Sequence, residues 1–230
     1  MNVNKLSEEL LFAVKMNESL EDLLILTADL SLDKLQAQLK SDNEKKAFWI
    51  NIYNAYFQIL RKEKKIRKPK IYKRKLLHIA GKQFSLDDVE QGILRKYKYK
   101  FSLGYLTNIF CARLIRELAV DTMDYRIHFA LNCGAKSCPP IAFYTPNQLD
   151  NQLTLATNSF LKNETDIDHN KREIRITRIF QWFLGDFGGK SGINRILDKH
   201  LSIETKGYKL IYKEFSREEA LANYVPPPAF

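Results

Sequence analysis

The side chains best suited to covalent chemistry lie in one short segment, residues 126–141, with the sequence RIHFALNCGAKSCPPI. His128 precedes Cys133 by five positions, and Cys138 follows five positions later. A thiolate is a strong nucleophile, and an imidazole is the usual base that activates it. A direct Cys133–His128 pair requires the chain to turn near residues 132–134, and Gly134 makes a turn there easy. This pattern indicates a thiol site.

Four interpretations of this segment compete. A cysteine attacks an acyl carbon with His128 as base and Asn54 or Asp186 as orienting group. Alternatively, His128, Cys133 and Cys138 bind zinc, although a fourth ligand and the usual CxxC pair are missing. The two cysteines could form a redox couple, but the missing CxxC argues against this as well. Finally, all three residues could be packing residues, an interpretation with about half the weight on residue types alone.

Length and composition indicate a globular protein. The chain has 230 residues, of which 45% are hydrophobic, enough for one substantial core. Neither a secretory signal nor an apolar stretch long enough to span a bilayer is recognisable. We therefore expect a cytoplasmic protein whose three cysteines are all free thiols. Cys111, in an amphipathic pattern, is expected to pack in the core.

The net charge of +10 is concentrated in one stretch. Residues 61–75, here called the basic segment, contain ten basic residues and one acidic residue, while the rest of the chain is almost neutral. A smaller cluster, residues 95–100, interleaves basic residues with Tyr97 and Tyr99. Such clusters can bind nucleic acid, an acidic membrane surface or an anionic substrate. A solvated, lysine-rich connection is the favoured interpretation, since no nucleic-acid motif accompanies the charge.

Hydrophobic periodicity and turn residues predict a single α+β domain, with N-terminal helices packed on a small, mostly antiparallel sheet. Helices are expected within residues 5–40 and over 42–61, 85–94, 106–118 and 146–161, with Asp42 and Ser85 as caps. Hairpins are expected near Gly81 and over 166–177, and a strand at 127–131. We divide the chain into an N-terminal helical segment (1–40), a core (41–205) and a C-terminal extension packed on the core (206–230).

Asn51, Asn54 and Gln58 share one face of the predicted 42–61 helix. This face is interpreted equally well as a solvated edge or as a polar strip that supports a site.

Four segments extend the thiol segment into a recognisable pattern. FWINIYNAY, HIAGKQFSLDDVEQGILR, RIHFALNCGAKSCPPI and TRIFQWFLGDFG occur in this order over residues 45–190. Together they resemble the domain of unknown function 547 family, and the HFALNC…KSCPP block is the most specific of them. The resemblance implies a single α+β domain found in bacteria and, fused to other regions, in plants and animals. It also implies kinship with papain- and transglutaminase-like thiol enzymes.

Two differences within the resemblance bear on the site. Gln91 stands where many members have histidine, so any role for a histidine there is lost. Plant members often replace the second loop cysteine by serine, which favours Cys133 as the shared thiol. In papain-like enzymes the nucleophile precedes the histidine, whereas His128 precedes Cys133. Kinship therefore requires a permutation or a downstream histidine, His169 or His200.

We therefore predict a cysteine-dependent hydrolase or acyltransferase of amide or ester bonds, with a peptide or other amide as substrate and without cofactor or metal. Cys133 is the expected nucleophile, His128 the base, Asn54 or Asp186 the orienting group, and the amides of residues 134–137 oxyanion donors. Further residues expected at the site are Cys138, Asn51, Glu90, Asn132, Lys136 and Ser137. The alternative is a non-catalytic binding module that engages an anionic partner through a basic hairpin (61–75, with 95–100).

Overall fold

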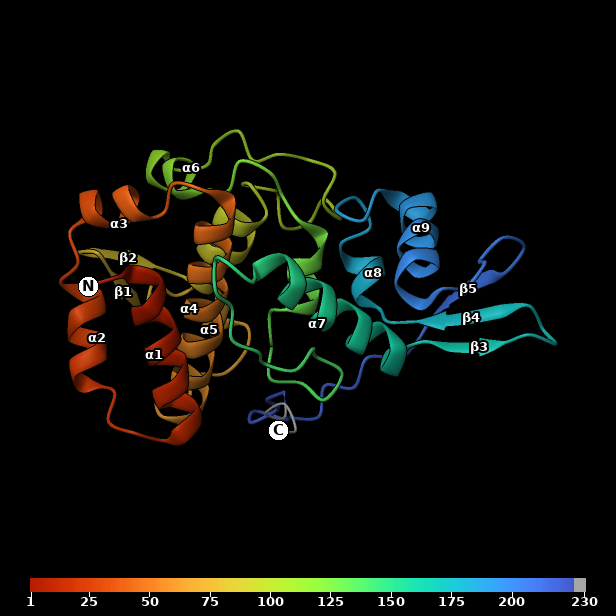
Figure 1. Cartoon of the computed structure of the whole chain (residues 1–230), viewed down its shortest axis with the longest axis horizontal. Coiled ribbons are helices and arrows are strands. Elements are labelled where there is room, and N and C mark those ends of the chain that lie inside the picture. The colour runs from red at the N-terminus through yellow and green to blue at the C-terminus, as the bar shows by residue number, and fades with distance from the viewer. Residues whose placement is uncertain (226–230) are drawn as a thin grey trace.

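The computed structural model describes residues 1–225 and confirms the α+β fold (Figure 1). The first part of the chain is mainly helical, with α1 (Val3–Met16), α2 (Glu21–Ala28), α3 (Leu32–Gln38), α4 (Asp42–Lys62), α5 (Lys70–Lys73) and the hairpin β1 (Leu77–Ile79) and β2 (Lys82–Phe84). The middle contains the π-helix η1 (Asp88–Leu94), α6 (Arg113–Leu118) and the 3₁₀ helix η2 (Tyr125–Phe129). The last part comprises α7 (Leu149–Glu164), β3 (Asp166–Asp168), β4 (Glu173–Ile176), α8 (Ile179–Trp182), α9 (Gly189–Leu201) and β5 (Lys209–Tyr212).

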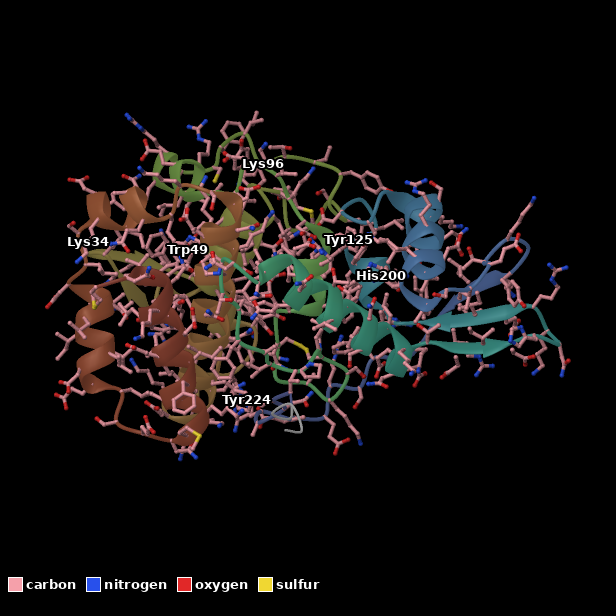
Figure 2. The ribbon with its side chains drawn as sticks, viewed as in Figure 1. Lys34, Trp49, Lys96, Tyr125, His200 and Tyr224 are labelled. Atoms are coloured by element: carbon pink, nitrogen blue, oxygen red, sulfur yellow. A yellow bond between two sulfur atoms is a disulfide. The ribbon has the colours of Figure 1, made fainter. Side chains whose placement is uncertain are left out.

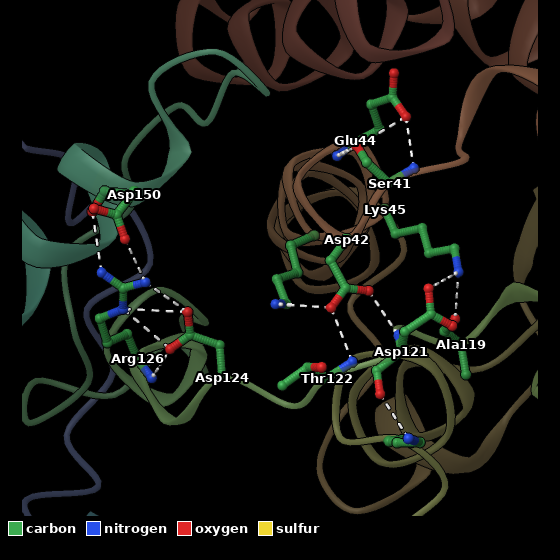
Figure 3. Close-up of polar contacts among 12 residues, drawn as sticks. Ser41, Asp42, Glu44, Lys45, Ala119, Asp121, Thr122, Asp124, Arg126 and Asp150 are labelled. Atoms are coloured by element: carbon green, nitrogen blue, oxygen red, sulfur yellow. Dashed lines mark hydrogen bonds and ion pairs between the residues drawn. The ribbon is translucent and has the colours of Figure 1, made fainter.

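Helix α4 is the centre of the first core. It begins at the N-cap Ser41, whose hydroxyl and Glu44 form a capping box, so the predicted cap Asp42 is wrong by one residue. Every residue from Lys45 to Leu60 is buried. The Asp42 carboxylate instead accepts hydrogen bonds from the amides of Asp121 (2.6 Å) and Thr122 (2.8 Å) (Figure 3). These bonds fasten the start of α4 to the segment that precedes η2.

A second core lies between α7, α8, α9 and the second sheet. Its aromatic centre includes Phe129 of η2, whose ring centroid is 5.5 Å from that of Phe160 and 5.7 Å from that of Phe180. The Tyr125 hydroxyl also hydrogen-bonds His200 Nε2 at 2.9 Å, joining η2 to α9 (Figure 2). Helix α7 runs between the two halves (Figure 1), with Leu149 and Leu153 in the first core and Phe160 and Leu161 in the second.

The strands form two separate sheets instead of the single sheet expected. Strands β1 and β2 pair antiparallel around Gly81, as the sequence predicts. Strands β3 and β4 also pair antiparallel, but β5 adds to β4 in parallel. The predicted 206–230 extension thus contributes a strand to the second sheet; residues 226–230 of it lie outside the described part. Within residues 1–225, no helix has both the length and the apolar character to cross a bilayer.

Two predicted elements near the thiol segment are wrong. The strand expected at 127–131 is replaced by η2, because the Asp124 carboxylate caps it by accepting from the Arg126 amide at 3.0 Å. The guanidinium of Arg126 then bonds both Asp124 and Asp150 of α7 (Figure 3). The helix expected over 106–118 is reduced to α6, since Asn108 Oδ1 accepts from the Phe110 amide and forms a turn instead.

Two asparagines of α4 fasten the chain on either side of the cysteines. Asn54 donates to the carbonyl of Ala130 (3.0 Å) and accepts from the amide of Asn132 (3.0 Å). Asn51 does the same for both backbone groups of Tyr144, at 2.8 and 3.1 Å. The polar face of α4 is therefore buried, and its two asparagines support the chain around residues 130–144, whereas the Gln58 amide has no hydrogen-bond partner in the described residues.

We expect Asn54→Ala to lower the free energy of unfolding by about 3 kcal/mol, because a buried amide and a buried carbonyl lose their partner. Asn43→Ala, on the exposed side of the same helix, is the matched control and should change it by about 0.5 kcal/mol or less. Urea denaturation measures both. Equal effects would show that the Asn54 hydrogen bonds add nothing to stability.

Candidate functional site

Three charged or polar side chains meet in the interior, between the two cores. Arg95 Nε donates to Asp186 Oδ2 at 2.6 Å, and His128 Nε2 lies 2.9 Å from the same oxygen. The side chains of Arg95 and Asp186 are completely buried, and that of His128 is 2% exposed. Buried charges are tolerated when they are paired in this way. Arg95, His128 and Asp186 are called the buried triad below.

Each member of the buried triad comes from a different element. Arg95 directly follows the π-helix η1, a rare element that often occurs at functional sites. His128 lies on η2, and Asp186 lies in the turn between α8 and α9. Phe183 orients two of them: the His128 ring stacks on it at 4.0 Å, and the Arg95 guanidinium lies 4.6 Å from its centroid.

The surroundings shift the pKa values of the acid and the base. Burial alone would raise the pKa of Asp186, but hydrogen bonds from His128 and Arg95 outweigh it and lower that pKa below 3.8. Burial lowers the pKa of His128 below 6.5, even though the hydrogen bond to Asp186 opposes this shift. At neutral pH the site therefore contains a carboxylate and a neutral imidazole.

These protonation states decide the tautomer of His128. An ionised carboxylate can only accept hydrogen bonds, so the proton of the neutral ring must be on Nε2. Nδ1 then carries the lone pair, and no hydrogen bond within residues 1–225 occupies it. Asp186 thus fixes His128 in the form that can act as a base.

Further polar residues extend from Arg95. Gln91 Oε1 accepts from the Arg95 guanidinium, and Glu90 Oε2 accepts from the Tyr53 hydroxyl at 3.2 Å. Burial raises the pKa of Glu90 above 4.5, while the charge of Arg95 opposes this shift. The pKa values of Glu90 and Asp186 are thus shifted in opposite directions, and of these two carboxyl groups only that of Asp186 is hydrogen-bonded to Arg95.

The cysteine loop differs from the sequence expectation. Cys133 and Cys138 are joined by a disulfide, with Cα atoms 6.0 Å apart (Figure 2). The prediction that all three cysteines are free is therefore wrong for this pair, and the pairing does not need the CxxC spacing. Only Cys111 is free among residues 1–225; it is half-buried in the loop before α6.

Other expected features of this loop also change. The amides of Gly134 and Lys136 are already bonded, to Asn132 Oδ1 at 2.7 Å and to the carbonyl of Glu218 at 2.8 Å, so neither is a free oxyanion donor. Ser137 Oγ accepts from the Ser216 amide, and Lys136 pairs with Glu218. The C-terminal segment thus covers the face of the loop where these side chains were expected to bind a ligand.

The structure brings together only part of the predicted site. His128 and Asp186 are in contact, as one of the two predicted arrangements requires. Asn54 is not the orienting group of the histidine, because both ends of its amide hold the backbone. Neither sulfur forms a hydrogen bond with His128 in the described residues, since the two sulfurs are bonded to each other. The 61–75 segment is also not a hairpin, but the end of α4 followed by α5.

Arg95 is the main residue that sequence reasoning missed. In the sequence it belongs to the basic cluster 95–100, yet it is the most deeply buried charge in that cluster. A usable signal was its position four residues after Gln91, at the end of an otherwise apolar helical pattern. Between residues 1 and 225, no three His, Cys, Asp or Glu side chains converge in a way that could hold a metal ion.

Comparison with known families gives one match. Residues 37–161 match the model of a protein family of unknown function, DUF547. The chain belongs to the DUF547 family. No match was found among curated proteins or among solved structures. The DUF547 region begins in α3 and ends in α7, so it contains Arg95, His128 and both loop cysteines, whereas Asp186 lies beyond it.

The buried triad predicts a pH dependence of stability. Because the folded protein binds a proton at His128 less readily than the unfolded chain, its free energy of unfolding should fall as pH is lowered from about 7 to about 5. His128→Gln should reduce this slope. Part of the slope should remain in this variant, because burial also lowers the pKa of His200. Asp186 acts in a lower window, because its pKa is already below 3.8. Urea denaturation across this range measures the slope; an unchanged slope in the variant would contradict the buried, neutral His128.

A second prediction concerns Gly104, which makes room for Asp186. It has a φ of +92°, and a Cβ there would lie 2.3 Å from Asp186 Oδ1 and 2.7 Å from the Asp186 amide. Gly81 has a φ of +66° but open space around it, so it is the matched control. Gly81→Ala should cost about 1 kcal/mol of stability from backbone strain, and Gly104→Ala about 2–4 kcal/mol because overpacking is added. Similar losses for both would mean that the loop yields without disturbing Asp186.

Proposed function

We propose that this DUF547 protein is a hydrolase or acyltransferase of amide or ester bonds, with His128 as general base and Cys133 as nucleophile. The observation that supports this best is the buried hydrogen bond of 2.9 Å between His128 and Asp186. It holds the ring in the tautomer whose Nδ1 can take a proton, and Arg95 keeps the carboxylate ionised.

The position of Cys133 relative to His128 also supports the proposal. The two residues flank the segment 130–132, and Asn54 fastens both ends of that segment to α4. The base and the thiol are therefore connected through a rigid piece of chain instead of a loose loop. Catalytic groups benefit from such support, because small displacements of a base or nucleophile reduce the rate strongly.

In this proposal the disulfide is the resting form. A dithiol reductant converts the Cys133–Cys138 bond to two thiols and becomes a disulfide itself. Cys133 Sγ then attacks the acyl carbon while its proton moves to His128 Nδ1. The bond to the leaving alcohol or amine breaks, and this group takes the proton from His128. Water, or another acceptor, finally attacks the thioester with His128 again as base.

Hydrolysis of p-nitrophenyl acetate tests this mechanism. The oxidised protein should be inactive, and dithiothreitol should activate it. Cys138→Ser should be active without reductant, because Cys133 can no longer be trapped. Cys133→Ser should be inactive in both conditions. We expect His128→Ala to lower the rate of the reduced protein by about 10²–10⁴-fold.

Cys111→Ser is the matched control, since Cys111 is the remaining free cysteine of the described chain and lies outside the loop. It should behave like wild type. Activity of the oxidised protein, or of Cys133→Ser, would rule out the thiol as nucleophile. Full activity of the reduced His128→Ala variant would rule out His128 as the general base.

A further inference from the structure

The loop between η1 and α6, residues 97–112 and called the apolar loop below, exposes an unusual amount of apolar surface. Of the 15 large apolar side chains exposed in the described chain, seven lie between residues 99 and 110. The most exposed are Phe110 at 89%, Phe101 at 78% and Ile109 at 75%. In Figure 1 the loop runs along the upper edge of the molecule, from α6 towards the turn before α9. Such a concentration marks a contact surface.

The form of this surface favours a bilayer over a folded protein or a nucleic acid. The most exposed side chains come from a turn-rich loop without a helix or strand of its own. Aliphatic residues such as Leu106 (63%) accompany the aromatic ones, and aliphatic side chains cannot stack on bases. Mixed aromatic and aliphatic side chains on a protrusion suit the boundary between lipid headgroups and acyl chains.

The charge around the loop specifies the type of lipid. Lys100 of the loop lies 5.4 Å from the ring of Tyr72 in α5, so the apolar loop borders the basic segment 61–75. In that segment ten basic residues oppose one acidic residue, and Lys70 and Lys73 of α5 are exposed. A cluster of cations beside inserted apolar side chains complements an anionic membrane surface.

The middle of the loop is fastened to the turn before α9, so the loop is held in place. The Leu103 carbonyl accepts from the Gly185 amide at 2.7 Å, and Gly104 lies against Asp186. Ser102 Oγ accepts from the Leu106 amide at 3.1 Å and closes the turn. Because the loop is already fastened by these contacts, binding through Phe101 and Phe110 requires little further loss of conformational entropy in the loop.

We propose that the apolar loop and the adjoining basic segment together form a docking surface for anionic lipid bilayers. This inference does not depend on the proposed catalytic function. The loop residues enter the headgroup region, and the lysines and arginines of the basic segment lie on the anionic headgroups.

Cosedimentation with vesicles tests the proposal on the full chain. The protein should bind vesicles of phosphatidylcholine that contain phosphatidylserine and should not bind vesicles of phosphatidylcholine alone. Phe101→Ser/Phe110→Ser should weaken binding by about tenfold or more, because the inserted apolar area is lost. Lys70→Glu/Lys73→Glu should also weaken it, and added salt should weaken wild-type binding steeply. Leu155→Ser is the matched control, as Leu155 is 67% exposed on α7, away from the loop.

Three outcomes would overturn the proposal. The first is no binding to phosphatidylserine vesicles. The second is equal binding by wild type and the Phe101→Ser/Phe110→Ser variant with the fold intact by circular dichroism. The third is binding to single-stranded polyuridylate at a salt concentration at which no vesicles are bound, which would assign the basic segment to nucleic acid.

Discussion

The arrangement of this protein depends on one buried oxygen atom, Oδ2 of Asp186, which accepts from both Arg95 and His128. A fully buried guanidinium without a counter-charge would cost several kcal/mol, and Asp186 supplies the counter-charge of Arg95. The contact also joins three segments that are distant in sequence: the end of η1, the 3₁₀ turn η2 and the turn before α9. Electrostatic pairing therefore holds the two cores together at the same point where it sets the protonation state of the histidine.

The histidine and the two loop cysteines are held in place by different contacts. His128 is directed by Asp186 and Phe183 towards the second core, while the cysteines are held by their own disulfide and by the segment 216–220. Asn54 is the connection between these parts, because it fixes the backbone between them. A thiol mechanism then has a defined requirement: the sulfur must be released from Cys138, whereas the base is already prepared. In the proposed mechanism, the redox state of the loop therefore controls whether the thiol is available.

The sequence predicts elements well where local signals agree, as for α4, the β1–β2 hairpin and the Ser85–Asp88 capping box, whose reciprocal hydrogen bonds measure 2.8 and 3.0 Å. Prediction from the sequence fails where a single polar side chain determines the backbone conformation. Asp124 turns an apolar stretch into a 3₁₀ helix, and Asn108 forms a turn in place of the first part of the predicted 106–118 helix. The pairing of His128 with Asp186 could be predicted as one of two arrangements, because an imidazole base needs an orienting group and Asp186 was a candidate for it. Arg95 stands next to other basic residues in the sequence, and only the tertiary structure shows that its charge is buried.

The apolar loop and the buried triad meet at Gly104 and Gly185, where the absence of side chains lets two backbone segments touch. Asp186 Oδ1 is buried beside Gly104 and has no hydrogen-bond partner in the described chain. An unpartnered carboxylate oxygen is costly, and it stays dry only while the loop covers it. Exposure of this oxygen to water would remove part of the burial that raises the pKa of Asp186, whereas loss of the hydrogen bonds from His128 or Arg95 would raise that pKa. The exposed loop and the buried base are thus linked by direct contacts through Gly104, Gly185 and Asp186.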